Sequence, residues 1–438
     1  MMNRPENNST NRKYVLLGAV LIELCIGMLN ANGAFTARLC DKTGRYALTL
    51  SQADWISSMA LAAFVVSVVI SGRLRDRVGP EKTMLIGGIS MGLGYLLGGF
   101  FGKTFAAQLI FIGIVAGAGA GMGFLVPFLA VVKWFHDRKG MALGVTASGF
   151  GLGAVFWSKL AETGFSINIM GLDGVQIVYL IFGMILIIAV IAGGKLVKYP
   201  PLGFVPPSSK TEINSSGRLD IEPCALLRSR PFYLTAAAFF FSSFAGFMII
   251  EYIMPYGTHV LKVQGLELKI AMKVAELAFF AAQAMVAAGC VFWGAFSDHA
   301  GRKLAIFLMC SVQGAVVFFY RYAAGSPQSI ILFSSIVGFI EGGNLVLFML
   351  LTGDYWGDEK MGIHYAFLFP AFGIAALAAP QIAFYLKDAA SRGNEASAWA
   401  LPFYMAGIAC VIAAFITFLN KPPAESQKQM DSRVQGFE

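Results

Sequence analysis

Charged side chains are scarce in this chain of 438 residues, since 13% are Asp, Glu, Lys or Arg and 57% are hydrophobic. A soluble domain has about 25% charged residues, so this chain cannot cover a water-facing surface of ordinary polarity. The alternative solvent is lipid, and a helix needs about 20 mostly apolar residues to cross a bilayer. The composition therefore excludes a water-soluble globular protein and predicts an all-α membrane protein.

The chain also lacks recognisable motifs for metal binding, phosphate binding or nucleophilic catalysis. Its six cysteines are scattered without a C-x-x-C pair, and we interpret them as small apolar core residues. Gly113, Gly117 and Gly121 follow helical spacing, which indicates tight helix packing rather than a phosphate loop. We therefore expect no metal, no cofactor and no enzyme activity.

The net charge of +8 does not predict nucleic-acid binding, because the lysines and arginines lie between apolar runs rather than on one patch. They are typical of topology signals, since cytoplasmic loops carry more of them than outer loops. Placing the N-terminus inside puts most of them on the inner side of the membrane. We expect a monomer in the cell (inner) membrane with both termini in the cytoplasm.

Twelve apolar runs are long enough to cross a bilayer. The longest polar stretch, 198–231, is rich in Pro and Ser and is typical of a cytoplasmic linker. It divides the chain into two six-helix halves, 1–197 and 232–438. The expected spans are 14–36, 52–72, 83–101, 105–132, 141–160, 175–197, 232–256, 270–295, 304–322, 329–351, 363–386 and 398–420.

One small charged loop occurs twice. Residues 72–82 read GRLRDRVGPEK, and residues 294–303 read GAFSDHAGRK. The aspartates of the two copies, Asp76 and Asp298, are 222 positions apart (298 − 76), which is about half of 438. Both loops follow the second span of a six-span half, so the pattern predicts a duplicated unit with two parallel repeats.

This repeated loop resembles the loop motif of the major facilitator superfamily, roughly G-x-L-x-D-R-x-G-R-R. The resemblance covers essentially the whole chain and implies twelve helices that alternate access to a central site. It implies that Asp76 accepts hydrogen bonds at the start of a helix in the opposite half, or pairs with an arginine there. The implied gating residues are Gly72, Asp76, Arg77, Gly79, Asp298, Gly301 and Arg302.

A narrower similarity is to the monocarboxylate and oxalate/formate branch of that superfamily. It rests on segments 133–157, 226–234, 290–302 and, more weakly, 27–35. The charged residues that bind anions in that branch are replaced here. In the eighth helix, Cys290 stands where the branch has an arginine and Val286 where it often has an aspartate. In the first and eleventh helices, Ala34 and Phe372 align with positions where some members have a lysine.

Four glutamates, by contrast, lie inside apolar runs, where an ionisable group is costly and therefore a candidate functional residue. The resemblance places helices 1, 4, 7 and 10 around the central cavity, and Glu23, Glu251 and Glu341 lie on that set. We expect these three to couple transport to protons. Each could instead form a structural hydrogen bond. Glu276, one turn after Lys273, is expected at a helix interface.

Uncharged polar residues in the same runs are candidates for substrate binding, although each could equally bridge two helices. Asn344 is one turn from Glu341, and this proximity makes it a stronger candidate for substrate binding. With the two replaced anion positions, the expected substrate-binding residues are Glu341, Asn344, Asn30, Asn32, Gln283, Cys290 and Phe372.

The sequence thus predicts a secondary transporter that moves a small organic solute, of the monocarboxylate type, together with protons. One alternative is exchange of a cationic or zwitterionic molecule for protons, because the candidate site has acids and no base. Against it, the fifth span, which contains GVTASGFGLG at 144–153, has no proline where drug–proton antiporters have a Gly-Pro pattern. A remote alternative is a transporter-like solute sensor.

Overall fold

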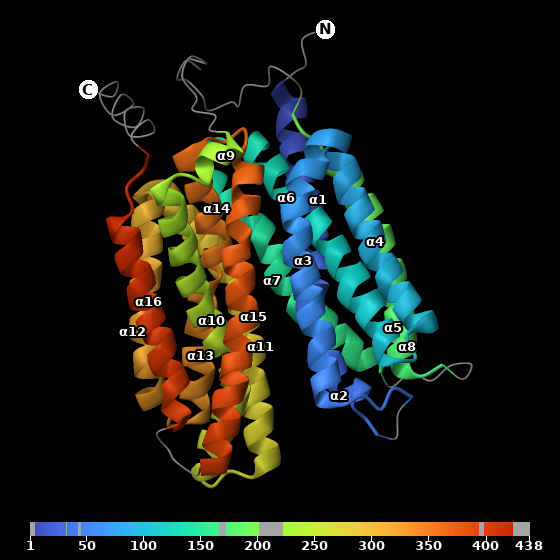
Figure 1. Ribbon diagram of the computed structural model, residues 1–438, viewed down its shortest axis with the longest axis vertical. Helices are drawn as coiled ribbons and strands as arrows, with labels where there is room; N and C mark the ends of the chain where they lie inside the picture. The colour runs from blue at the N-terminus through green and yellow to red at the C-terminus, as the bar shows by residue number, and fades with distance from the viewer. Residues whose placement is uncertain are drawn as a thin grey trace. The chain divides into compact units, whose positions relative to one another are not determined.

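The computed structural model describes residues 5–31, 33–42, 45–165, 172–200, 222–393 and 398–423 (Figure 1). Asn32 and most of the expected linker lie outside these ranges. In chain order the helices are α1 (Pro5–Ile26), the 3-10 helix η1 (Gly27–Ala31), α2 (Gly33–Leu39), α3 (Leu50–Val78), α4 (Pro80–Phe101), α5 (Phe105–Gln108), the π-helix η2 (Leu109–Ala116), α6 (Gly117–Trp134), α7 (Lys139–Gly164), α8 (Gly174–Leu196), α9 (Pro223–Leu226), α10 (Arg230–Val263), α11 (Leu268–Ala300), α12 (Arg302–Ala323), α13 (Pro327–Glu341), α14 (Gly343–Trp356), α15 (Met361–Gly393), the 3-10 helix η3 (Ala398–Ala400) and α16 (Leu401–Leu419).

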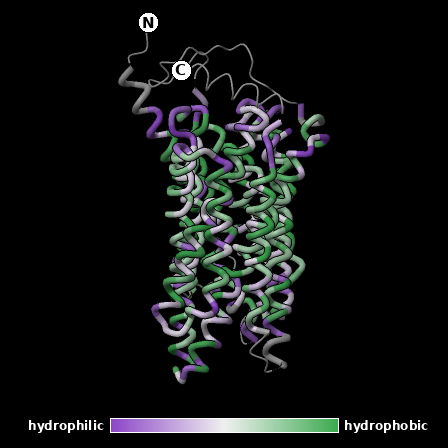
Figure 2. The backbone as a smooth tube through the Cα atoms, turned by 90° about the vertical axis from the view of Figure 1, so that its left-hand side faces the viewer, coloured by the Kyte–Doolittle hydropathy of each residue, from purple (hydrophilic) through white to green (hydrophobic). Residues whose placement is uncertain are grey.

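The described residues contain twelve helical segments that are long and apolar enough to cross a membrane. Each matches one predicted span, so the all-α fold with twelve spans is confirmed. The seventh and tenth segments, Arg230–Val263 and Pro327–Trp356, begin two residues before the predicted runs and end seven and five residues after them, respectively. Figure 2 shows that hydrophobic residues fill the middle of the helices and hydrophilic ones gather toward their ends.

Capping residues define several helix starts. The side chain of Thr49 accepts a hydrogen bond from the backbone N–H of Gln52, whose side chain accepts one from the backbone N–H of Thr49. Asp173 and Ser326 form equivalent capping boxes at the starts of α8 and α13. These bonds satisfy N–H groups that the first turn of a helix leaves without partners.

Both copies of the repeated loop turn at a single glycine. Gly79 separates α3 from α4 with φ +91°, and Gly301 separates α11 from α12 with φ +85°. A side chain at either position would clash with the backbone, whereas glycine adopts such values freely. The glycine of the motif therefore allows two consecutive spans to reverse direction with one connecting residue.

The chain divides into two compact units. Unit 1 contains Met1–His136 and Val145–Pro206, and unit 2 contains Asp137–Gly144 and Pro207–Glu438. The division falls inside α7, because the first turn of this helix packs within unit 2 and the remainder packs within unit 1. One continuous helix therefore belongs to both units.

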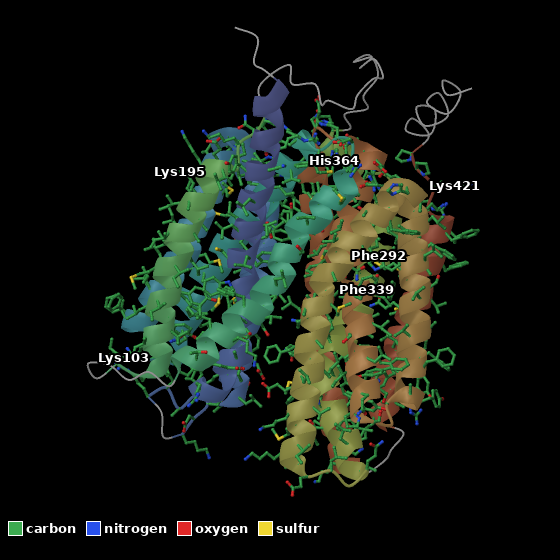
Figure 3. All side chains as sticks on the ribbon, turned by 180° about the vertical axis from the view of Figure 1, so that it is seen from behind. Lys103, Lys195, Phe292, Phe339, His364 and Lys421 are labelled. Carbon is green, nitrogen blue, oxygen red and sulfur yellow. The ribbon has the colours of Figure 1, made fainter. Side chains whose placement is uncertain are left out.

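Within unit 2, α11 and α13 approach closely because small residues face each other. A Cβ atom on Gly289 would lie 1.8 Å from the carbonyl oxygen of Phe339, and one on Gly338 would lie 2.0 Å from that of Ala282. The rings of Phe292 and Phe339 flank this crossing with centroids 5.0 Å apart (Figure 3). Such close backbone approach is the usual use of small residues in membrane helices.

We predict that Gly289→Ala lowers the stability of the detergent-purified protein by about 1–3 kcal/mol, because the added methyl group forces α11 away from α13. The matched control is Gly407→Ala on α16, where an added Cβ would meet only the carbonyl oxygen of Gly314 at 3.9 Å. Melting curves of the two variants check this. Equal melting temperatures would contradict the packing argument.

Candidate functional site

The tenth span is interrupted at its centre, beside a buried glutamate. Glu341 is the last residue of α13, Gly342 forms the break, and α14 begins at Gly343. A Cβ on Gly342 would lie 2.1 Å from the carbonyl oxygen of Val286, and one on Gly343 would lie 2.4 Å from the Met309 sulfur atom. A Cβ at position 342 would meet backbone atoms, so only glycine fits there. The neighbouring Glu341 has 8% of its surface exposed.

Two side-chain amides hold the Glu341 carboxyl group. Asn344 Nδ2 donates to Glu341 Oε2 over 2.9 Å, and Gln313 Nε2 donates to the same oxygen over 3.2 Å. Gln313 lies on α12 and is completely buried. In the described part of the chain, Gln313 Oε1 has no hydrogen-bond partner.

The network continues to α10 and back to α12. Ser242 Oγ donates to Asn344 Oδ1 over 2.6 Å, and the Cys310 thiol donates to Ser242 Oγ over 3.4 Å. Both amide positions of Asn344 are therefore occupied, which determines its orientation. Four helices, α10, α12, α13 and α14, contribute to this buried polar cluster of Ser242, Cys310, Gln313, Glu341 and Asn344.

A glycine on α10 makes room for the carboxyl group. A Cβ on Gly246 would lie 1.5 Å from Glu341 Oε2, so any larger residue would displace the acid. Gly246 follows Ser242 by one turn, and both face the polar cluster. Among the described residues the Glu341 carboxyl group forms no ion pair, and its hydrogen bonds come from the two amides.

Glu23 on α1 is the corresponding buried acid of unit 1. It is completely buried, and neither carboxyl oxygen has a hydrogen-bond partner among the described residues. A Cβ on Gly149 of α7 would lie 3.2 Å from the Glu23 Cβ. An isolated ionised carboxylate is very costly in such a place.

Cys290 and Phe372, two of the predicted substrate-binding residues, are buried. Cβ atoms on Gly144 and Gly342 would lie 2.3 Å from the Cys290 carbonyl oxygen and 2.6 Å from its backbone nitrogen, respectively. Cys290 therefore lies between α7 and the start of α14. The rings of Phe372 and Phe239 are tilted by 32° to each other, with centroids 5.5 Å apart.

The other predicted residues lie outside the buried cluster. Glu251 is exposed on α10, Asn30 is exposed in η1, and Gln283 and Glu276 are half-buried on α11. Of the predicted substrate-binding and proton-coupling residues, the structure brings together Glu341 and Asn344, with the backbone of Cys290 next to Gly342. The structure adds Gln313 and Ser242 to this group. The sequence feature that could have identified them is a polar side chain inside an apolar run.

The second copy of the repeated loop makes an extensive contact inside unit 2. Asp298 accepts hydrogen bonds from the backbone N–H groups of Gly140 and Met141 at the start of α7, over 2.8 and 2.9 Å. Arg302 Nη1 lies 2.8 Å from the same carboxylate. A carboxylate at a helix N-terminus is favoured by both the free N–H groups and the helix dipole.

Two further contacts strengthen this junction. Gly140 and Gly294 touch backbone to backbone, since a Cβ on Gly140 would lie 2.1 Å from the Gly294 carbonyl oxygen. Lys139 pairs with Asp358 beyond the end of α14. We call this assembly around Asp298, Arg302 and the first turn of α7 the α7 latch.

The first copy of the loop is different. Asp76 is exposed and pairs with its neighbour Arg75 over 3.0 Å, and Arg77 is also exposed. Gly72 is buried in α3. The helix-start hydrogen bonds that the resemblance implies for Asp76 are formed by Asp298 instead, and Asp76 has a local ion pair with Arg75.

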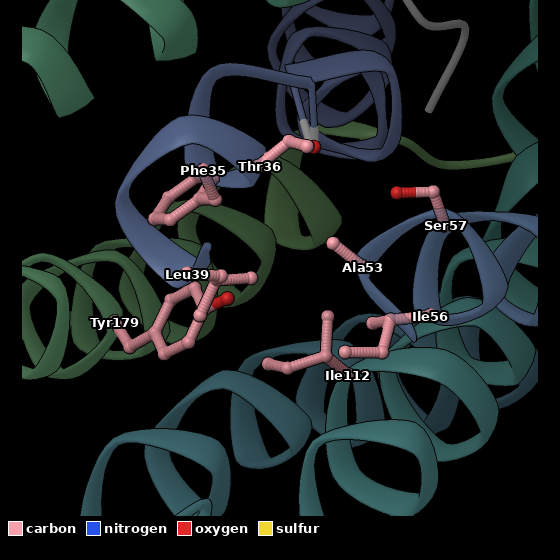
Figure 4. A pocket seen from close by; sticks show the side chains of 8 residues that line it. All are labelled: Phe35, Thr36, Leu39, Ala53, Ile56, Ser57, Ile112 and Tyr179. Carbon is pink, nitrogen blue, oxygen red and sulfur yellow. The ribbon is translucent and has the colours of Figure 1, made fainter. Parts of the chain in front are cut away.

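A small pocket in unit 1 has no features of a substrate site. Figure 4 shows Phe35, Leu39, Tyr179 and Ile112 around it, with Ser57 and Thr36 at its margin. Its volume of about 10 Å³ holds at most one water molecule. The lining is mainly apolar and lacks an ionisable carboxylate or amine.

Comparisons with known proteins agree on one family. A family model described as Major Facilitator Superfamily matches residues 15–380 and 267–435. The oxalate:formate antiporter of Oxalobacter formigenes is 25% identical over 390 residues, covering 86% of this chain and 86% of the antiporter. Monocarboxylate transporter 14 of Mus musculus is 27% identical over 108 residues, covering 25% of this chain and 21% of that transporter.

A solved structure with a similar fold is that of the proton:xylose symporter XylE bound to 6-bromo-6-deoxy-D-glucose. It matches with a TM-score of 0.70 and 14% identity, covering 96% of this chain and 99% of the symporter chain. At this identity the likeness shows the fold alone.

We predict that Asp298→Asn destabilises the protein and that Asp76→Asn does not. An asparagine at 298 has one acceptor oxygen for two backbone N–H groups and loses its charge-assisted bond to Arg302, a combined loss of about 2–3 kcal/mol. Asp76 is exposed, so its substitution removes only a weak surface pair. Melting temperatures of both variants check this, and equal values would contradict the latch.

Proposed function

This chain belongs to the major facilitator superfamily, and we propose that it is a proton-coupled transporter of a monocarboxylate-type organic acid. It is a secondary transporter and a multi-pass membrane protein. The proposal assigns substrate binding and proton coupling to the polar cluster around Glu341. The names of the relatives support an organic acid as the substrate class.

The proposal rests on one observation: the buried carboxyl group of Glu341 has no basic side chain as a partner among the described residues. Glu341 accepts two amide hydrogen bonds, and no charged side chain of the described residues compensates its charge. Two carboxylates that share a site of low dielectric repel each other strongly, so one of them must carry a proton. A substrate carboxylate can therefore bind beside Glu341 only when a proton is bound as well.

This requirement makes the coupling obligatory. A protonated Glu341 donates a hydrogen bond to the substrate carboxylate, and proton and anion then cross together as a neutral pair. Bringing an anion into an apolar site without compensation costs several kcal/mol or more. The arginine of the monocarboxylate branch, replaced here by Cys290, would supply the same compensation with a fixed charge instead of a proton.

Alternating access requires that the α7 latch open and close. We propose that the latch lies at the cytoplasmic end of the helices, as the distribution of Lys and Arg indicates, and that it stabilises one of the two access states. The two repeated loops would alternate, with Asp298 bound in this state and Asp76 bound in the other. The protein would work as a monomer in the cell membrane.

An alternative substrate class is favoured by one detail of the same site. Both amides donate to Glu341 Oε2, which stabilises the carboxylate form. A carboxylate in this place could pair with an amine. A protonated amine or a zwitterion would then exchange for the proton, and substrate and proton would move in opposite directions.

We predict that Glu341→Gln abolishes proton coupling. Purified protein is reconstituted in liposomes, and internal pH is recorded while lactate, formate, oxalate or an amine is added outside. For the wild-type protein a transported acid should acidify the interior beyond the leak of empty liposomes. The variant should lose this acidification but keep exchange of labelled substrate, because the glutamine amide still donates a hydrogen bond.

Two outcomes would contradict the proposal. Acidification by the variant at the wild-type rate would remove Glu341 from the coupling step. Proton release driven by amines in the wild-type protein, and absent in the variant, would replace the organic acid by a cation as the substrate.

Glu23 is proposed as a second proton-carrying residue, since a buried carboxyl group without partners holds its proton. We predict that Glu23→Gln slows proton-driven uptake without abolishing it, because the amide reproduces only the neutral form of the acid. Initial uptake rates at several external pH values check this. An unchanged rate across the pH range would assign Glu23 a purely structural role.

A further inference from the structure

We infer that Gln313 is a positioning residue that changes its hydrogen bond with the protonation state of Glu341. When the acid is charged, Gln313 Nε2 donates to Glu341 Oε2, as in the structure. When a proton binds to Oε2, the Gln313 amide turns over and its Oε1 accepts the new O–H. This inference rests on the proposed function of Glu341 as the coupling acid.

The first argument is the unequal constraint on the two amides. Asn344 Oδ1 accepts a hydrogen bond from Ser242, so turning this amide would break that bond and require the Ser242 hydroxyl to turn as well. Gln313 Oε1 has no partner among the described residues, so its amide can turn without breaking a second bond. Gln313 can therefore follow the proton with fewer rearrangements than Asn344.

The second argument is the chemistry of the acid. A carboxylate oxygen accepts, whereas a protonated oxygen must donate. In the structure Glu341 Oε2 faces two N–H donors, so a proton on this oxygen needs an acceptor in the place of one of them. The completely buried Oε1 of Gln313 is the acceptor that a half-turn of the amide brings to that place.

The third argument is reversibility. Each orientation of Gln313 satisfies one end of the amide and leaves the other end unpaired. In neither protonation state are all the hydrogen-bonding groups of Gln313 and Glu341 paired. Neither the protonated nor the charged form is therefore strongly favoured by Gln313. A coupling acid has to bind and release its proton in every cycle, and a residue that serves both states in turn suits this task.

The surroundings of Glu341 contain few other titratable groups. Those within electrostatic reach are the thiols of Cys290 on α11, Cys310 on α12 and Cys410 on α16. From α10 and α14 come the uncharged Ser242, Gly246 and Asn344. Among the described residues, no charged side chain reaches the carboxyl group, so a pH-dependent change here reports Glu341 itself.

The test is an infrared titration of the purified full-length protein without substrate. The carboxylic C=O band of Glu341 is assigned by its loss in Glu341→Gln. In Gln313→Met, which keeps the side-chain volume, the carboxylate loses a charge-assisted bond and the acid loses a weaker neutral one. The titration midpoint of Glu341 should therefore rise by about one pH unit.

A second measurement tests the turn itself and needs no change at position 313. Glutamine is labelled with ¹³C at the side-chain carbonyl, and difference spectra are recorded on acidification. One labelled band should move to lower wavenumber as its oxygen becomes an acceptor. The shift should be absent in Glu341→Gln, where no proton can bind.

The outcomes separate the inference from the proposed function. If Glu341 titrates but its midpoint in Gln313→Met equals that of the wild-type protein, Gln313 does not contact the titrating oxygen and the inference fails alone. If no labelled carbonyl band moves on acidification, the Gln313 amide does not rotate and the inference also fails. If Glu341 does not titrate at all in the wild-type protein, both the inference and the proposed function fail.

Discussion

A carboxyl group among apolar helices needs either a proton or a cation, and the polar architecture of unit 2 depends on this requirement. Glu341 has no basic partner among the described residues, and its hydrogen bonds come from neutral amides. In the proposed mechanism the site changes its charge by taking up and releasing a proton. A fixed arginine would bind an anion at all times, whereas the proposed arrangement would bind one only together with a proton.

The polar cluster is possible only because the helices around it touch through glycines. Gly246, Gly342 and Gly343 each occupy a place where a Cβ would lie within 2.5 Å of another atom. These contacts bring Ser242, Gln313 and Asn344 within reach of one another. Close packing and polar chemistry are thus linked, since larger side chains would separate the groups that form the network.

The sequence predicted the spans well because each apolar run is a local property, and all twelve have a helical counterpart. It also identified Glu341 and Asn344, which lie one turn apart in the same span. It did not identify Ser242 and Gln313, because their bonds to Asn344 and Glu341 join positions 102 and 28 residues apart. Such pairs are determined by how the helices pack.

The division of α7 between the two units has a mechanical consequence. Its first turn is held by Asp298, and nine residues later Gly149 packs against α1 beside Glu23. A helix rises about 1.5 Å per residue, so roughly 13 Å of stiff rod joins the two places. One helix therefore carries both the backbone N–H groups that bind Asp298 and the glycine that packs beside the buried Glu23.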